Sequence, residues 1–153
     1  MSIDVKTEQK NFWNIFDDKL IENGEPFFVL HERKGEVTYY AVVNKNRSFV
    51  DNALSIDFLT REQKLRINIY IRNDLGLYSV FERNRQNIEK MVGVPLQWIE
   101  GKKSATTRRI ACEIPIEIGY CSNYADVIDE VLPVVVRMKK VCETFAKNHF
   151  FDF

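Results

Sequence analysis

Two neighbouring segments with strict apolar–polar alternation constrain the fold of this chain more than any other feature. They are ALSIDFL (53–59) and KLRINIYIR (64–72), and residues 60–63 between them suit a turn. A period of two is typical of strands that bury one face, so the segments predict an antiparallel hairpin. The predicted partners are Phe58 with Leu65, Ile56 with Ile67 and Leu54 with Ile69 on the apolar face, and Asp57 with Arg66 and Ser55 with Asn68 on the polar face. A one-residue slip would expose every apolar side chain, which fixes this register.

The remaining elements follow from periodicity and from turn residues. Helices are expected over Thr7–Asn23, Leu75–Val92 and Asn123–Phe150, and further strands over 26–32, 37–43, 95–100 and 108–114. Gly93 predicts the end of the second helix, and Pro133 predicts a kink or a junction between two helices in the third segment. The order α-ββ-ββ-α-ββ-α predicts an α+β fold of two layers. In it, three helices cover one face of a mainly antiparallel sheet of about six strands.

The length of 153 residues predicts a single domain over residues 1–153. The chain is 45% hydrophobic and 29% charged, which is ordinary for a globular protein. No apolar run approaches the roughly 20 residues of a membrane helix, and no secretory signal is visible, so neither a membrane nor export is expected. Cys112, Cys121 and Cys142 form no CxxC pair. They predict reduced thiols in a cytoplasmic protein with no metal site and no cofactor.

Charge is unevenly distributed along the chain. The net charge is zero, yet the segment from Arg61 to Arg109 contains 11 Lys and Arg against five Asp and Glu. A neutral chain with such a basic middle can present a basic face, although it would not coat nucleic acid indiscriminately.

Two parts of the basic middle suit phosphate contact. The polar face of the strand 64–72 presents Lys64, Arg66, Asn68, Tyr70 and Arg72, and the next hairpin adds Lys102, Lys103, Arg108 and Arg109. Cations interleaved with an aromatic side chain can hold a nucleic-acid backbone while a base stacks. These residues predict binding of DNA or RNA. The alternative is an ordinary solvated face, because outward strand positions are usually polar and lysines blunt sheet edges.

Three motifs resemble a known family. They are the FW-x-x-F opening (Phe12, Trp13, Phe16), the LRINIYI strand that runs into a helix, and LQW-x-x-GKKS followed by RRI. Together they resemble an uncharacterised bacterial domain family whose members are often fused behind a restriction-endonuclease-like nuclease module. The resemblance covers roughly Lys10 to Phe145. It implies a setting near DNA restriction or phage defence, but no catalytic residues, and the nuclease module is not in this chain.

A nuclease is a further alternative. Glu100-x-Lys102 matches the end of a restriction-type motif, and Asp57 or Asp51 could supply the second carboxylate for Mg²⁺. Glu100 lies directly before a glycine, where a turn is expected, and Asp57 has Arg66 as a cross-strand partner. We therefore assign no catalytic residue.

The C-terminus suggests a protein-interaction function. Phe150, Phe151 and Phe153 lie beyond the clear helical periodicity. Such a cluster packs on its own core, joins a homodimer, or docks on a separate nuclease subunit. The sequence thus favours a non-catalytic accessory domain that contacts nucleic acid, then an interaction or dimerisation module, and last an Mg²⁺-dependent nuclease.

Overall fold

The computed structural model describes residues 4–22, 29–33, 36–42, 52–59, 61–72, 74–100, 107–117, 119 and 121–150. Its elements are α1 Val5–Glu22, β1 Val29–Arg33, β2 Glu36–Val42, β3 Asn52–Leu59, β4 Lys64–Arg72, α2 Leu75–Arg83, α3 Arg85–Val92, β5 Gln97–Glu100, β6 Thr107–Pro115 and α4 Cys121–Phe150. The strands form one sheet in the order β1-β2-β3-β4-β6-β5, and every neighbouring pair is antiparallel. The predicted α+β class and antiparallel sheet are confirmed.

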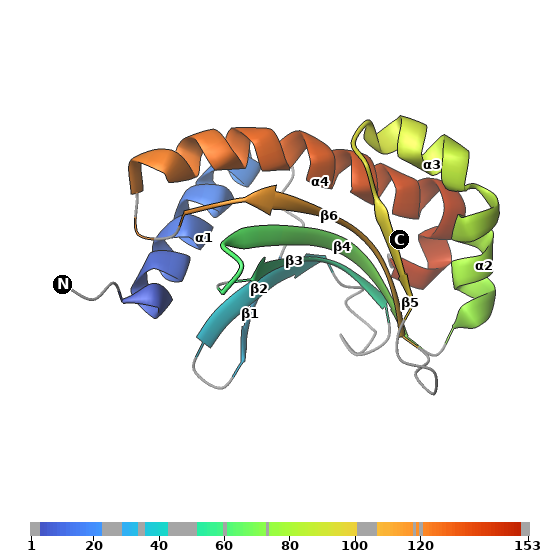
Figure 1. Ribbon diagram of the computed structural model, residues 1–153, viewed down its shortest axis with the longest axis horizontal. Coiled ribbons are helices and arrows are strands. Elements are labelled where there is room, and N and C mark those ends of the chain that lie inside the picture. Colours follow the sequence, from blue (N-terminus) through green and yellow to red (C-terminus); the bar gives the residue numbers. More distant parts are fainter. Residues whose placement is uncertain are drawn as a thin grey trace.

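The helices lie on one side of a curved sheet. Figure 1 shows α1 and α4 along the convex face, with α2 and α3 at the end where β5 lies. The concave face carries no helix among the described residues, and we call it the open face. None of the described helices combines the length and the apolarity that crossing a bilayer requires.

The register of the central hairpin is the one that alternation predicts. In the structure β3 and β4 pair Phe58 with Leu65, Ile56 with Ile67, Leu54 with Ile69, Asp57 with Arg66 and Ser55 with Asn68. The apolar members are buried against the helices, where they form the centre of the core. Pairing with β6 places Ile110, Cys112 and Ile114 on the same buried face.

The predicted helix over 75–92 is two helices, so the described residues contain four helices where the sequence predicted three. The break falls at Asn84, whose side-chain amide donates to the Val80 carbonyl at 2.8 Å. Asparagine competes with the backbone for such bonds and is therefore unfavourable inside a helix. In contrast, α4 continues through Pro133 without interruption, which excludes the junction between two helices, one of the two outcomes predicted for Pro133.

An aromatic cluster joins α1 to the sheet and to α4. The centroid of the Phe12 ring lies 5.0 Å from those of Trp13 and Phe58 and 5.7 Å from that of Tyr124, and all three contacts are edge-on. The Tyr124 hydroxyl donates to the Glu8 carboxylate at 2.8 Å, which ties α4 to α1. The FW-x-x-F opening therefore belongs to the hydrophobic core.

Gly93 ends α3 in the left-handed conformation, with a φ of 76°. An added Cβ would meet only Arg137 Nη1 at an ordinary 3.5 Å, so Gly93→Ala should cost backbone strain and little packing energy. We expect a loss of about 1 kcal/mol in the free energy of unfolding, measured by urea denaturation. Gly76→Ala, inside α2 with no positive φ, is the control and should not destabilise the protein. Equal losses in both variants would contradict this role of Gly93.

Candidate functional site

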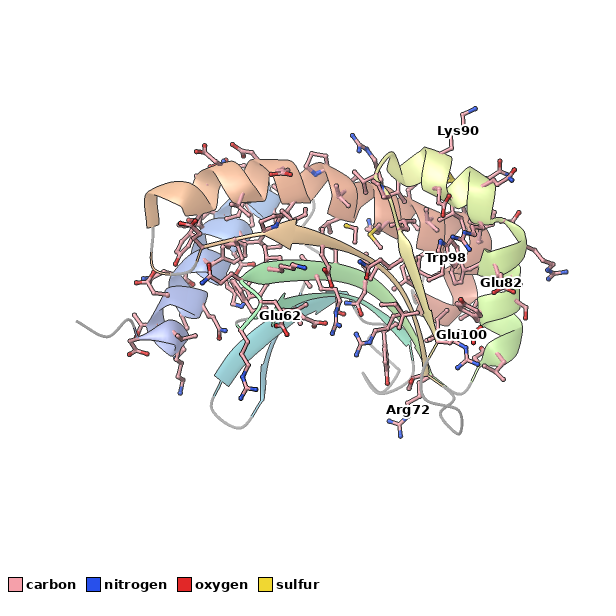
Figure 2. All side chains as sticks on the ribbon, in the orientation of Figure 1. Glu62, Arg72, Glu82, Lys90, Trp98 and Glu100 are labelled. Atoms are coloured by element: carbon pink, nitrogen blue, oxygen red, sulfur yellow. The ribbon has the colours of Figure 1, made fainter. Side chains whose placement is uncertain are left out.

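The open face is organised around β4. Its polar positions alternate with buried ones, as the sequence predicted, and Arg72 extends from the open side of the sheet in Figure 2. Register brings three neighbouring strands to the same face, so that Arg66 lies between Asp57 of β3 and Glu113 of β6. Tyr70 lies beside Arg109 of β6.

Asn68 is the centre of this face and is fully buried although it lies on the polar side. Its Nδ2 donates to Ser55 Oγ at 2.7 Å, to the Ser55 carbonyl at 3.2 Å and to Asp57 Oδ2 at 3.3 Å. Its Oδ1 accepts a hydrogen bond from Arg109. We refer to Ser55, Asp57, Arg66, Asn68 and Arg109 as the polar network. Because buried amides need partners, the network explains how a polar residue is accommodated there.

One carboxylate oxygen serves both arginines of the polar network. Asp57 Oδ2 lies 3.1 Å from Arg66 Nη2 and 3.6 Å from Arg109 Nη1. In addition, Arg66 Nε is buried and has no hydrogen-bond partner among the described residues. The network thus has more N–H donors than acceptors and an excess of positive charge.

Arg109 is a partly desolvated cation of this face, with 31% of its side chain exposed. Its guanidinium lies over the Tyr70 ring, 4.8 Å from the centroid, in a cation–π arrangement. Burial lowers the pKa of Arg109 from its ordinary value. The charge of Arg66 lowers that pKa further, and Asp57 and Tyr70 act in the opposite direction. An anion bound at this face would therefore relieve unfavourable electrostatics.

More exposed charges flank the polar network. Lys64 pairs with Glu113 at 3.1 Å but keeps 43% of its side chain exposed, and Arg72 is exposed at the other end of β4. Among the described side chains of β3 to β6, the open face therefore presents four cations and two carboxylates.

The structure does not bring every predicted site residue to this face. Lys64, Arg66, Tyr70, Arg72 and Arg109 share it. Arg108 pairs with Ile71 and Glu100 on the helix side, where its guanidinium lies 5.8 Å from the Tyr78 ring centroid, so its grouping with the open-face cations is wrong.

Several other predicted residues fall outside the described parts of the chain. Lys102, Lys103 and the phenylalanines 151 and 153 lie there, as does Asp51. Phe150 is the last residue of α4, and its side chain is not described.

The carboxylates of the nuclease alternative are separated by the sheet. Asp57 lies on the open face, whereas Glu100 pairs with Arg108 on the helix side. Three strand spacings of about 4.8 Å separate them by roughly 14 Å across the sheet, and the five residues from Glu113 to Arg108 add about 16 Å along it, so they are too far apart to share a metal ion. The described residues contain no cluster of three potential metal ligands. Asp57 is instead a member of the polar network.

Trp98 holds β5 to α3 and has no role on the open face. Its Nε1 donates to Glu89 Oε1 at 3.0 Å, and Arg85 Nε donates to the same oxygen at 3.1 Å. These two bonds, from Trp98 and then Arg85, lower the pKa of Glu89. The LQW motif therefore serves packing. Cys112 and Cys142 are free and buried, as the cysteine pattern predicted, and burial raises the pKa of Cys112 to about 11.

Comparison with known proteins supplies a family but no activity. No curated protein and no solved structure matched the chain. A family model described as Domain of unknown function (DUF4268) matches residues 8–146. This span includes all of the aromatic cluster, the polar network and most of α4. The resemblance to an uncharacterised family is confirmed at that level. The chain belongs to the DUF4268 family of domains of unknown function.

Proposed function

We propose that this domain binds the phosphate backbone of a nucleic acid on its open face and performs no catalysis itself. The observation that carries the proposal is the pair of partly desolvated guanidiniums, Arg66 and Arg109, that share one oxygen of Asp57. A phosphate near them would accept hydrogen bonds from donors for which the protein provides too few acceptors.

The shape and chemistry of the face favour a polymer over a small anion. Lys64 and Arg72 are at opposite ends of β4, eight residues apart, and about 3.3 Å per residue separates them by roughly 26 Å. Tyr70 lies between them as a platform for a base, already backed by Arg109. Charges spread along a strand with an aromatic residue between them suit single-stranded DNA or RNA.

Two parts of the proposal rest on sequence alone. Lys102 and Lys103 would extend the contact from the hairpin between β5 and β6. The bacterial restriction or phage-defence setting comes from the family resemblance. In that setting the domain would hold nucleic acid for a separate nuclease subunit.

The test is removal of the two exposed cations with no role in the polar network. A double variant, Lys64→Ala with Arg72→Ala, should weaken binding of a fluorescein-labelled oligonucleotide of about 12 nucleotides by about tenfold at about 50 mM salt. It should also reduce the salt slope of log K by about 1.4, since two contacts at about 0.7 each are lost. Fluorescence anisotropy measures both quantities.

A matched control removes two exposed cations on the helix side. Arg83→Ala with Lys90→Ala changes the net charge equally, and Lys90 points away from the sheet in Figure 2. This control should change affinity by less than about twofold. Equal weakening in both double variants, or no binding by the unaltered protein at about 50 mM salt, would overturn the proposal.

A further inference from the structure

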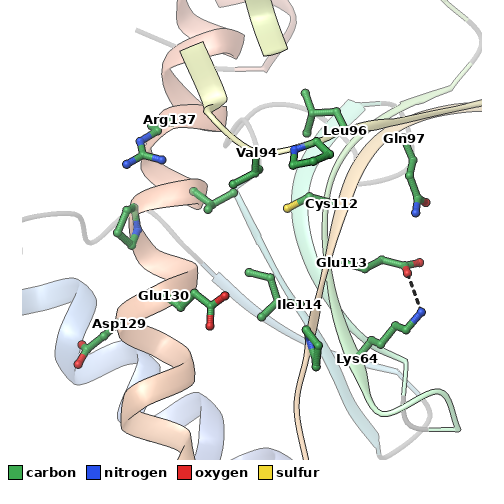
Figure 3. Close-up of a pocket in the computed structure, with 14 residues that line it drawn as sticks. Lys64, Val94, Leu96, Gln97, Cys112, Glu113, Ile114, Asp129, Glu130 and Arg137 are labelled. Atoms are coloured by element: carbon green, nitrogen blue, oxygen red, sulfur yellow. Dashed lines mark hydrogen bonds and ion pairs between the residues drawn. The ribbon is translucent and has the colours of Figure 1, made fainter. Parts of the chain in front are cut away.

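Two carboxylates lie on the open face among the cations that we propose to contact phosphates. Asp57 and Glu113 flank Arg66 in one row across β3, β4 and β6. Figure 3 shows the Glu113 and Lys64 side chains on the side of β6 away from α4. A carboxylate beside a bound phosphate repels it, so the presence of both acids on such a face requires an explanation.

Asp57 is explained by the polar network. Its Oδ2 is the counterion of Arg66 and Arg109 and also accepts a hydrogen bond from Asn68. Without this carboxylate, the two guanidiniums would repel one another on neighbouring strands. Glu113 contacts none of Arg66, Arg109 and Asn68 through a hydrogen bond or an ion pair, so it needs a different explanation.

The ion pair of Glu113 with Lys64 occupies only one carboxylate oxygen. Lys64 Nζ donates to Glu113 Oε2 at 3.1 Å, which is the dashed line in Figure 3. Because Lys64 remains exposed, this pair contributes little to stability. Glu113 Oε1 accepts no hydrogen bond from any residue that the structure describes. An ionised acceptor therefore remains available on the open face.

Arg66 lies directly opposite Glu113 on β4 and offers the complementary groups. It donates to Asp57 through Nη2, and its Nε has no hydrogen-bond partner among the described residues. No hydrogen bond or ion pair joins Arg66 to Glu113, although the two are cross-strand partners. A donor and an acceptor, each without a partner in the described parts of the chain, thus lie on neighbouring strands about 4.8 Å apart.

Such a pair suits a ligand that presents an acceptor and a donor close together. In an RNA chain the phosphate oxygens accept hydrogen bonds, and the ribose 2′-hydroxyl donates one at every nucleotide. A DNA chain has the same phosphates but no 2′-hydroxyl, and the amino groups of its bases vary with sequence. The 2′-hydroxyl is the group by which a protein tells RNA from DNA at a given site.

We propose, on the basis of the function proposed above, that the bound nucleic acid is single-stranded RNA and that Glu113 is the specificity-determining residue. Glu113 Oε1 accepts a hydrogen bond from a ribose 2′-hydroxyl, while Arg66 donates to the neighbouring phosphate. A hydrogen bond to an ionised acceptor is about twice as strong as one between neutral groups, so one such contact produces a measurable preference. With DNA the same carboxylate has no donor to bind and repels the phosphates, which widens the difference.

Three fluorescein-labelled oligonucleotides of about 12 nucleotides test this preference by fluorescence anisotropy at about 50 mM salt. They share one sequence of A and C and differ only at the 2′ position, as RNA, DNA and 2′-fluoro RNA. RNA should bind at least about fivefold more tightly than DNA. The 2′-fluoro RNA should bind within about twofold of DNA, because fluorine preserves the ribose conformation of RNA but donates no hydrogen bond.

The outcomes separate this proposal from the one on which it rests. Equal binding of RNA and DNA would overturn the preference for RNA and leave nucleic-acid binding by the open face standing. Binding of neither would overturn both. If the 2′-fluoro RNA bound as tightly as RNA, the face would recognise the shape of the strand, and a hydrogen bond from the 2′-hydroxyl to Glu113 would be excluded.

Variants of Glu113 test the assignment of this residue. Glu113→Ala should bring the RNA and DNA affinities to within about twofold of one another, whereas Glu113→Gln keeps an oxygen acceptor and should retain a ratio of about threefold. Glu82→Ala removes the same charge from an exposed position of α2 (Figure 2) and should leave the ratio unchanged. Since each ratio compares two ligands of one protein, a loss of folding in a variant affects both affinities alike. An unchanged ratio in Glu113→Ala would overturn the role of Glu113.

Discussion

Phe12→Ala should lower the free energy of unfolding by about 3–5 kcal/mol, the largest effect we expect from any single substitution. Phe12 is fully buried and contacts rings from the sheet, from α4 and from its own helix. Removing the ring leaves a cavity where three elements meet, and the cluster can collapse only in part. Urea denaturation should show a lower midpoint with an unchanged m value, and the melting temperature should fall by about 10 °C.

The control for this prediction lies on the same helix. Ile21 is 66% exposed, so Ile21→Ala removes apolar atoms without creating a cavity. It should change stability by less than about 0.5 kcal/mol. Similar losses in Phe12→Ala and Ile21→Ala would mean that α1 does not anchor the domain as the structure indicates.

Asp57→Asn should move stability and nucleic-acid affinity in opposite directions. The substitution keeps the shape of the side chain but removes the charge shared by Arg66 and Arg109. Two guanidiniums would then face one another without a counterion. Because Asp57 is 20% exposed, solvent screens part of the effect, and we expect a loss of about 2 kcal/mol in the free energy of unfolding.

Affinity should rise in the same variant. The open face gains one unit of positive charge, so oligonucleotide binding should strengthen by about threefold at about 50 mM salt, measured where both proteins are folded. Ser55→Ala is a useful comparison, since it removes a hydrogen bond to Asn68 without changing the charge. A fall in affinity for Asp57→Asn would show that the polar network serves only to stabilise the sheet.

The sequence predicted the central hairpin well because one rule dominates there. Burial of one strand face leaves a single register open, and Ile56 opposite Ile67 follows from it. The end of α3 at Gly93 was equally predictable from the sequence, since the left-handed backbone conformation at a helix end favours glycine. Both features depend on residues that are close in the sequence.

Features that depend on tertiary context were not predictable in the same way. Asn84 gave a weak signal for a helix break, since asparagine is tolerated in many helices that packing stabilises. Arg108 and Arg109 were grouped by adjacency, but neighbouring strand residues face opposite sides, and only Arg109 joins the polar network. Applying this alternation rule to the predicted strand 108–114 would have assigned Arg108 and Arg109 to opposite faces.

The cavity between β6 and α4, lined by Cys112, Ile114 and Val134, had no sequence signal at all. It arises because β5 is four residues long and β6 is nine, while α4 passes over the uncovered part. The length of β5 is set by where the chain, coming from α3, enters the sheet. Prediction of element boundaries from sequence is too coarse to reveal such a mismatch.

The polar network would give the open face a thermodynamic advantage in the binding we propose for it. A flexible arginine gives up rotamer freedom when a ligand fixes it, at a cost of about 0.5–1.5 kcal/mol for each side chain. Here Arg66 is held by Asp57, and Arg109 by Asn68 and the Tyr70 ring, so folding has already imposed that order. A polyanion arriving at this face would meet preorganised donors. Its association should therefore carry a smaller entropic penalty than binding to the mobile lysines of an ordinary basic surface.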